Sequence, residues 1–387
     1  MLPLFFAALA NVVGLGVIVP LLPFYAEGAG ASPQQIAWLF AIFSGAQFLT
    51  APLWGRLSDR IGRKPVIVIS LLGTALGYVW LAFADGLAGI FLARAFSGVM
   101  NGWLATSQAY VADVTPPEGR AKGMGMLGAA FGIGFIIGPA LGGYLVGGGT
   151  PDFELPILLA AGSSGLALAV ALFALEEPQR HGAAAPTESL KIAGIARVVP
   201  ILAVMIGLNF GIFFVFAGME STFAVWCGQA LAMGPRDVGY YLSFAGVVGV
   251  VVQGWLVGKL APRVGEGWLV TAGLVALAAA LALLPTSTSP PMLLTPIALL
   301  SLGFGLATPA LVSLVSRTAS EDIRGGALGV SQSAQSLGRI LGPAWAGFAF
   351  VNFGRDWPFF SGALILLPLV AVAAAMTRRL RAQSGNT

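Results

Sequence analysis

The chain has 387 residues, of which 57% are hydrophobic and 9% are charged, and its mean hydropathy is +0.88. A soluble domain carries roughly a quarter charged residues, so this composition excludes a water-soluble globular protein. The single cysteine and the single histidine exclude a disulfide framework and a cluster of His and Cys metal ligands.

Apolar runs long enough to cross a bilayer recur along the whole chain. A span needs roughly 20 apolar residues to cross a hydrocarbon core of about 30 Å. We therefore expect an all-α membrane protein with twelve transmembrane helices, near residues 2–26, 35–57, 66–84, 87–110, 123–147, 155–175, 198–226, 237–258, 267–285, 292–315, 327–351 and 358–376.

The longest polar break lies close to the middle of the chain and has the Ala, Pro, Ser and Gly content of a flexible linker. It predicts an N-terminal six-helix bundle at 1–175, a cytoplasmic linker at 176–197, and a C-terminal six-helix bundle with a short basic tail at 198–387.

Basic residues indicate the orientation of the spans. With both termini in the cytoplasm, the inner loops and the tail hold 16 of the 20 Lys and Arg residues, as the positive-inside rule requires. The basic pI of about 9.5 then needs no nucleic-acid partner. We expect an integral protein of a bacterial inner (plasma) membrane with both termini cytoplasmic.

The two predicted halves share an internal repeat. Residues 55–62 (GRLSDRIG) are echoed by 258–265 (GKLAPRVG) at an offset of 203, and Arg120, Gly134 and Gly138-Pro139 recur at an offset of 204. Duplicated six-helix halves are the build of one large transporter class, in which the solute site lies between the halves near the bilayer midplane.

Several motifs together resemble those of the major facilitator superfamily. They are GRLSDRIGRKP at 55–65, RAFSG at 94–98, the glycine series of 134–143, NVVGLGVIVPLLP at 11–23 and AYVADVTPPEGRAK at 109–122. The last two are similar to the tetracycline and multidrug efflux branch. Asn11 stands where tetracycline exporters tend to have Asp, and Pro262 replaces the acid of the second loop motif. Both departures argue against tetracycline as the substrate.

The loop motif at 55–65 has two interpretations. Acidic and basic side chains at the membrane surface can bridge helix ends as a latch that stabilises the outward-open state, or the basic residues can serve only as an insertion signal. On the latch reading, the gating residues are Gly55, Asp59, Arg60, Gly62, Arg63, Lys64, Asp113 and Arg120.

Charged side chains inside apolar spans are the strongest functional candidates, because each costs about 2.5–3.5 kcal/mol at mid-membrane. They are Arg94, Glu220 and Arg339. Glu27 or Glu220 could neutralise Arg94, and the sequence does not choose between them. Burial favours the neutral form of a carboxyl group, so Glu220 is the leading candidate for carrying a coupling proton. Arg94 and Glu27 are the further candidates for proton coupling. A structural ion pair is the alternative.

The third, sixth, ninth and twelfth spans lack charged, Asn and Gln side chains in their apolar cores, which is typical of lipid-facing helices. The other spans carry the candidates for a substrate cavity: Asn11, Asn101, Gln108, Asn209, Gln332, Gln335 and Arg339. Hydrogen bonds that hold helices together are an equally weighted explanation. Gly134, Gly138, Pro139, Gly142 and Gly143 form a packing motif, expected either to meet a helix of the other half and resist proton leak or to pack ordinarily.

We therefore expect a secondary transporter that is not an enzyme and exports lipophilic or amphipathic small molecules in exchange for protons. A transporter of a dedicated metabolite (sugar, siderophore or amino-acid derivative) is the first alternative, and a non-transporting receptor the second. The expected partners are the solute, protons and membrane lipids, with no cofactor, no metal and a monomeric state.

Overall fold

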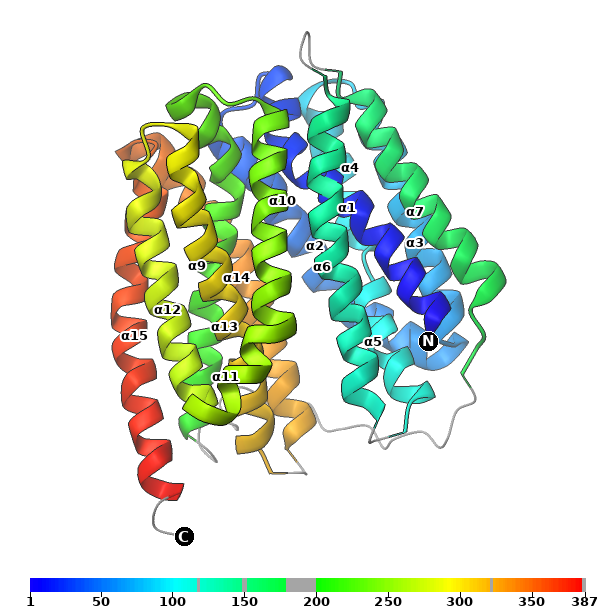
Figure 1. The fold of residues 1–387 in the computed structure, drawn as a ribbon. Helices are drawn as coiled ribbons and strands as arrows, with labels where there is room; N and C mark the ends of the chain where they lie inside the picture. The colour runs from blue at the N-terminus through cyan, green and yellow to red at the C-terminus, as the bar shows by residue number, and fades with distance from the viewer. Residues whose placement is uncertain (117–118, 148–151, 179–199, 321–322, 385–387) are drawn as a thin grey trace. The chain divides into compact units, whose positions relative to one another are not determined.

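The computed structural model describes the chain except for residues 117–118, 148–151, 179–199, 321–322 and 385–387. The described residues form helices joined by short loops (Figure 1). Their bounds are α1 Leu2–Gly28, α2 Pro33–Ile61, α3 Arg63–Ala82, α4 Gly86–Met100, α5 Trp103–Val114, α6 Arg120–Leu145, α7 Glu154–Ala174, α9 Pro200–Leu231, α10 Pro235–Val251, α11 Val257–Val264, α12 Glu266–Leu283, α13 Leu294–Thr318, α14 Arg324–Phe353 and α15 Trp357–Ser384. A π-helical turn, Val252–Leu256, joins α10 to α11, and two short 3₁₀ turns, Leu284–Thr286 and Pro290–Leu293, lie between α12 and α13.

The predicted all-α membrane fold is confirmed. Eleven spans in the described part of the chain are long and apolar enough to cross a bilayer. They correspond to eleven of the twelve predicted spans, with α4 and α5 forming one of them and α10 to α11 another. The remaining predicted span is α14, whose lower hydropathy follows from the Gln and Arg side chains in its sequence.

The chain divides into two compact units. Unit 1 comprises Met1–Ala183 with Ala224–Val247, and unit 2 comprises Ala184–Phe223 with Val248–Thr387. The end of α9 and most of α10 therefore group with the first unit. Most of the predicted linker at 176–197 lies outside the described residues, and the division into bundles at 1–175 and 198–387 stays a prediction.

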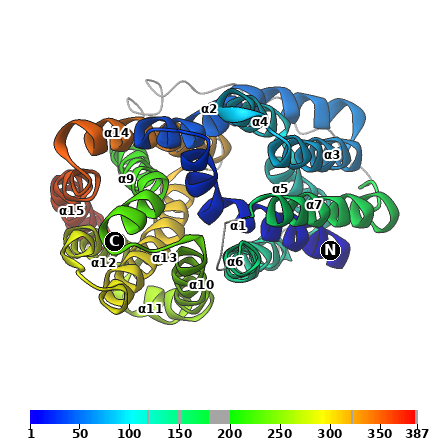
Figure 2. The same cartoon turned by 90° about the horizontal axis from the view of Figure 1, so that it is seen from above.

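In unit 1, α1 packs mainly against α6 and α7, and α3 packs against α7 and α4 (Figures 1 and 2). Their buried apolar side chains form one core cluster that includes Leu4, Ile67, Trp103 and Leu127. Trp103 of α5 stacks on Phe131 of α6, with ring centroids 5.7 Å apart. The first helix is thus held along its length inside its own unit.

In unit 2, α12 packs mainly against α13 and α15 (Figure 2). Gly273 of α12 and Gly303 of α13 allow the backbones to touch, because a Cβ atom on either would lie 2.6 Å from the other's carbonyl oxygen. On the other side of the unit, Gly338 and Gly342 of α14 meet the backbone of α9 at Phe214. Small residues at these crossings give the close approach that stabilises membrane helices.

The sequence encodes the ends of α2 directly. Ser32 accepts a hydrogen bond from the Gln35 amide N–H at 3.3 Å, and the Gln35 side chain accepts one from the Ser32 N–H at 2.8 Å. With Pro33 in the first turn, this is a complete capping box. The helix stops at Gly62, whose φ of 111° a side chain would disfavour.

The predicted span at 87–110 is broken in the middle. Helix α4 ends at Met100 and α5 begins at Trp103, so Asn101 and Gly102 lie outside regular helix. A break at membrane depth frees backbone groups that water cannot reach, and neighbouring side chains must satisfy them.

Side chains from α2 and α3 fill this requirement. Trp54 donates from its indole nitrogen to the Val99 carbonyl at 2.6 Å. Ser70 donates to the Met100 carbonyl and accepts from the Gly102 N–H at 2.9 Å. Gly102 lies directly under the Trp54 ring, where no side chain would fit. The break is therefore clamped from two helices.

We predict that Ser70→Ala destabilises the protein, because it removes two hydrogen bonds at the break, each contributing about 0.5–1.5 kcal/mol, and leaves the Met100 carbonyl and the Gly102 N–H only their 2.9 Å bond to each other. The expected loss in the free energy of unfolding is about 1–3 kcal/mol, seen as a fall of several degrees in the Tm of the detergent-purified protein. Thr74→Val is the matched control, since Thr74 donates only within its own helix, to the Ser70 carbonyl. Equal melting temperatures of the two variants would contradict the clamp.

Candidate functional site

The predicted latch residues form an ion-pair network at the junction of α2, α3 and α5. Arg63 donates from Nη1 to Asp59 Oδ1 and from Nε to Asp113 Oδ2, both at 2.7 Å. It also donates to the Ser58 hydroxyl at 2.9 Å. One guanidinium at the start of α3 thus connects the end of α2 to the end of α5.

The network is partly shielded from solvent. The side chain of Arg63 is 18% exposed and that of Asp113 is 32% exposed, whereas Asp59 is 67% exposed. Exposed ion pairs contribute only about 0.2–1 kcal/mol each, so the Arg63–Asp113 pair is the stronger of the two. Arg60 is exposed, Gly55 borders open space, and the side chain of Arg120 lies outside the described residues.

A residue that sequence reasoning missed completes the network. Glu177, just beyond α7, accepts hydrogen bonds from the backbone N–H groups of Arg63 at 2.7 Å and Lys64 at 2.8 Å. It caps the N-terminus of α3, where a negative charge is favourable. Its carboxylate occupies the space that a side chain on Gly62 would need. The Glu pair after the sixth span was visible in the sequence, but nothing in its spacing linked it to α3.

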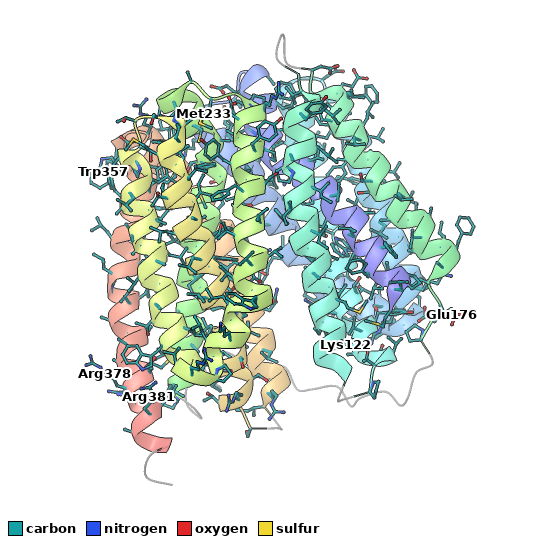
Figure 3. All side chains as sticks on the ribbon, viewed as in Figure 1. Lys122, Glu176, Met233, Trp357, Arg378 and Arg381 are labelled. Atoms are coloured by element: carbon teal, nitrogen blue, oxygen red, sulfur yellow. The ribbon has the colours of Figure 1, made fainter. Side chains whose placement is uncertain are left out.

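Tyr110 ties the same segment to α5. Its hydroxyl donates to the Glu176 backbone carbonyl at 2.9 Å. Lys122 and Glu176 lie at the same end of unit 1, and Met233 lies at the other end (Figure 3). The ion pairs, the cap and this tyrosine thus gather the ends of α2, α3, α5 and α7 at one end of the unit.

Unit 2 carries the same arrangement with the charges exchanged. At the repeat offsets, Arg63 corresponds to Glu266 and Asp113 to Arg317. Arg317 lies 3.5 Å from Glu266, whose carboxylate also accepts from the Ser313 hydroxyl at 2.6 Å. Gly265, with φ of 89°, matches Gly62. Because Glu266 itself stands in the first turn of α12, this helix carries its own N-terminal acid.

The predicted interior charges divide between the units. In unit 1, Arg94 is 4% exposed, and its guanidinium lies over the Phe43 ring, 4.2 Å from the centroid. Glu27 is exposed near the end of α1.

In unit 2, Arg339 of α14 lies 4.9 Å from the centroid of the Phe213 ring of α9. Glu220 of α9 is near enough for its charge to attract the Arg339 guanidinium.

Aromatic rings of α9 and α13 continue from the Phe213 ring that Arg339 contacts. Phe216 stacks on Phe304 with centroids 4.1 Å apart, and Phe213 meets the same ring edge-on at 5.4 Å. Phe210 and Phe214 lie on the same helix, 5.8 Å apart. Phe213 and Phe216 stand seven and four residues before Glu220, so this aromatic wall shares a face of α9 with the acid.

The polar candidates are of two kinds. Asn11 and Asn209 are buried in helix contacts: Asn11 accepts from the Ser164 hydroxyl at 3.0 Å, and Asn209 donates to the Ser331 hydroxyl at 2.7 Å. These bonds match the alternative in which such residues hold helices together. Gln335 is also buried, at 8% exposure.

Three other polar candidates are more accessible. Asn101 is half-buried at the α4–α5 break, and its side-chain oxygen is buried without a hydrogen-bond partner. Gln108 and Gln332 are exposed.

The glycine motif of α6 faces two helices. Gly134, Gly138 and Gly142 lie against the backbone of α1, where a Cβ atom on Gly138 would come 2.6 Å from the Val13 carbonyl oxygen. Gly143 and the Pro139 carbonyl face α10, at Arg236 and Gly239. The motif thus packs mainly within its own half of the sequence and meets the other half through α10, and its role in proton leak stays a prediction.

The sequence matches the Major Facilitator Superfamily over residues 4–343 and, in an overlapping second match, over 254–387. The chain belongs to the Major Facilitator Superfamily. This confirms the resemblance inferred from the motifs and makes the chain a membrane transporter rather than an enzyme.

Relatives within the superfamily include two bacterial resistance proteins. The tetracycline resistance protein of class E from Escherichia coli is 32% identical, over 90% of this chain and 87% of that protein. Multidrug resistance protein 2 of Bacillus subtilis (strain 168) is 30% identical, over 95% and 93%.

Solved structures share the fold. The human organic anion transporter MFSD10 has a TM-score of 0.75 at 25% identity, covering 96% of this chain and 98% of that one. The nucleoside transporter NupG has a TM-score of 0.80 at 15% identity, covering 97% and 98%, and shows the fold alone.

We predict that Glu177→Ala lowers transport several-fold at normal membrane levels, because the first amides of α3 lose their acceptor and Arg63 loses its fixed position. Glu177→Gln keeps one acceptor oxygen, so its transport rate is expected to lie between those of the wild type and Glu177→Ala. Initial rates in everted vesicles, corrected for protein amount, measure the effect.

Glu176→Ala is the matched control for this prediction, because the neighbouring acid takes part through its backbone carbonyl only. Wild-type rates in Glu177→Ala would show that the cap has no part in transport.

Proposed function

We propose that the chain exports lipophilic or amphipathic small molecules in exchange for protons by alternating access. The observation that carries this proposal is Glu220. Among the described helices it is the one carboxylate that lies more than two turns from a helix end. The likeness to tetracycline and multidrug resistance proteins over most of both chains supports the same conclusion.

The surroundings of Glu220 suit a proton carrier. A carboxylate at membrane depth is costly unless it is paired, hydrated or protonated. The neighbouring Arg339 supports the charged form, and the Phe213, Phe216 and Phe304 rings offer an environment that favours the neutral form. Solute binding next to Glu220 can shift the equilibrium from its neutral to its charged form and so release the proton.

The aromatic wall favours an apolar solute over a sugar-like one. Aromatic faces bind lipophilic molecules and organic cations, whereas a dedicated metabolite site needs convergent polar groups. A transporter of one defined metabolite is the second candidate, favoured by the half-buried Asn101, whose buried carboxamide oxygen has no hydrogen-bond partner.

The network of Asp59, Arg63 and Asp113 acts as a latch that stabilises the outward-open state. It lies at the end of unit 1 that the positive-inside rule places in the cytoplasm. We also propose that the protein works as a monomer in the bacterial plasma membrane, surrounded by lipid and with both termini cytoplasmic.

The deciding experiment uses purified protein in liposomes that contain an internal pH dye. Lipophilic cations, tetracycline, sugars and siderophores are added in turn under an imposed pH gradient. Proton movement that depends on lipophilic solutes supports export by antiport. Movement with one polar metabolite only would favour the second candidate.

We predict that Glu220→Gln abolishes proton-driven uptake into inverted vesicles and leaves solute counterflow intact, because the amide binds solute but cannot release a proton. Both rates are measured in the same vesicles. Glu154→Gln, an exposed acid in the first turn of α7, is the matched control and should drive uptake normally. Normal driven uptake in Glu220→Gln would remove this residue from the coupling mechanism.

We predict that Asp59→Asn slows transport at normal membrane levels, because Arg63 keeps Asp113 but loses the carboxylate of α2. Asp85→Asn, in the loop before α4, removes the same charge elsewhere and serves as the control. Full activity in Asp59→Asn would favour the alternative in which the loop motif is only an insertion signal.

A further inference from the structure

A long apolar groove runs along the outer surface of unit 2, beside α12. It has a volume of about 610 Å³ and is lined by Trp268, Ala272, Ala276 and Ala279 of α12, by Val264 at the end of α11, and by Leu299 of α13. The α12 residues recur at intervals of three or four, so they share one face of the helix. Small side chains along that face leave the surface hollow.

The groove has the length of an acyl chain that lies in one leaflet. From Trp268 to Ala279, α12 rises 11 residues, or about 16 Å at 1.5 Å each. A leaflet is about half of a hydrocarbon core of about 30 Å. Thr271 is the polar side chain of the lining, and its hydroxyl already donates to the Gly267 carbonyl at 3.0 Å. The lining thus suits a hydrocarbon chain and not a polar solute.

One end of the groove is basic. Arg381 of α15 donates to the Val264 carbonyl at 2.6 Å, and its guanidinium lies 5.8 Å from the Trp268 ring centroid. Arg378 lies one turn earlier at the same end of α15 (Figure 3), and Arg263 directly precedes Val264. All three arginines are exposed. A tryptophan among arginines at the mouth of an apolar groove is typical of the membrane interface.

We propose that this groove is a binding site for one anionic phospholipid. Its phosphodiester lies at the arginines and one acyl chain lies along the alanine face of α12. Basic pockets at the ends of membrane helices bind anionic headgroups, and the chain contributes the buried apolar area that free phosphate lacks. The site is separate from the solute site proposed above, so binding is tested without transport.

Native mass spectrometry of the purified protein tests the site with a mixture of phosphatidylglycerol and phosphatidylcholine that have identical acyl chains. The wild type is expected to retain one phosphatidylglycerol several-fold more often than phosphatidylcholine. Arg381→Gln is expected to bring the two occupancies to about the same value. Ala276→Trp, which fills the groove and keeps every arginine, is expected to lose this first bound lipid.

Arg379→Gln is the matched control. It removes the same charge from the same turn of α15, but at 100° per residue it points about 160° away from Arg381, and it is expected to keep the preference. Millimolar inorganic phosphate should not displace the lipid.

Equal retention of the two lipids by the wild type would overturn the proposal, as would an unchanged preference in Arg381→Gln or Ala276→Trp. Displacement by phosphate would assign the arginines to a free anion instead.

Discussion

A backbone N–H or carbonyl group inside a bilayer has no water to bind, and much of this structure follows from that constraint. A continuous helix satisfies it without help. Where a helix breaks or begins near the membrane, another helix must supply the missing partner. Ser70 and Trp54 do so at the break between α4 and α5, and Glu177 does so at the start of α3. These side-chain hydrogen bonds between helices therefore stand where a helix breaks or begins.

The same low dielectric shapes the interior charges. Arg94 and Arg339 each lie against a phenylalanine ring, Phe43 and Phe213 respectively. A ring face stabilises a cation without offering a hydrogen bond that could compete with a solute or a carboxylate. Arginine keeps its charge under all physiological conditions. Among the described residues, Glu220 is consequently the interior acid that we propose changes its charge during transport, while the two arginines stay charged.

The fold was predictable because bilayer thickness and composition dictate it. The first span, expected at 2–26, is the helix Leu2–Gly28. The break at Asn101 and Gly102 was not predictable, because it lies within a continuous apolar run and depends on Ser70, 32 residues earlier in the chain. The latch residues came from a motif, but Glu177 is 114 residues from Arg63 and carries no spacing signal. The role of Asn11 was left open until its partner Ser164 was known.

The exchanged charges of the two repeats have a consequence for how the chain diverged after duplication. Helix α12 begins with its own acid, whereas α3 begins with Arg63 and borrows Glu177 from the segment after α7. The two halves are therefore no longer interchangeable parts. Grafting the start of α3 onto α12 would place an arginine at an uncapped helix N-terminus opposite Arg317. Because of this one exchanged charge pair, the start of α3 fits only beside Glu177, and the start of α12 fits only beside Arg317.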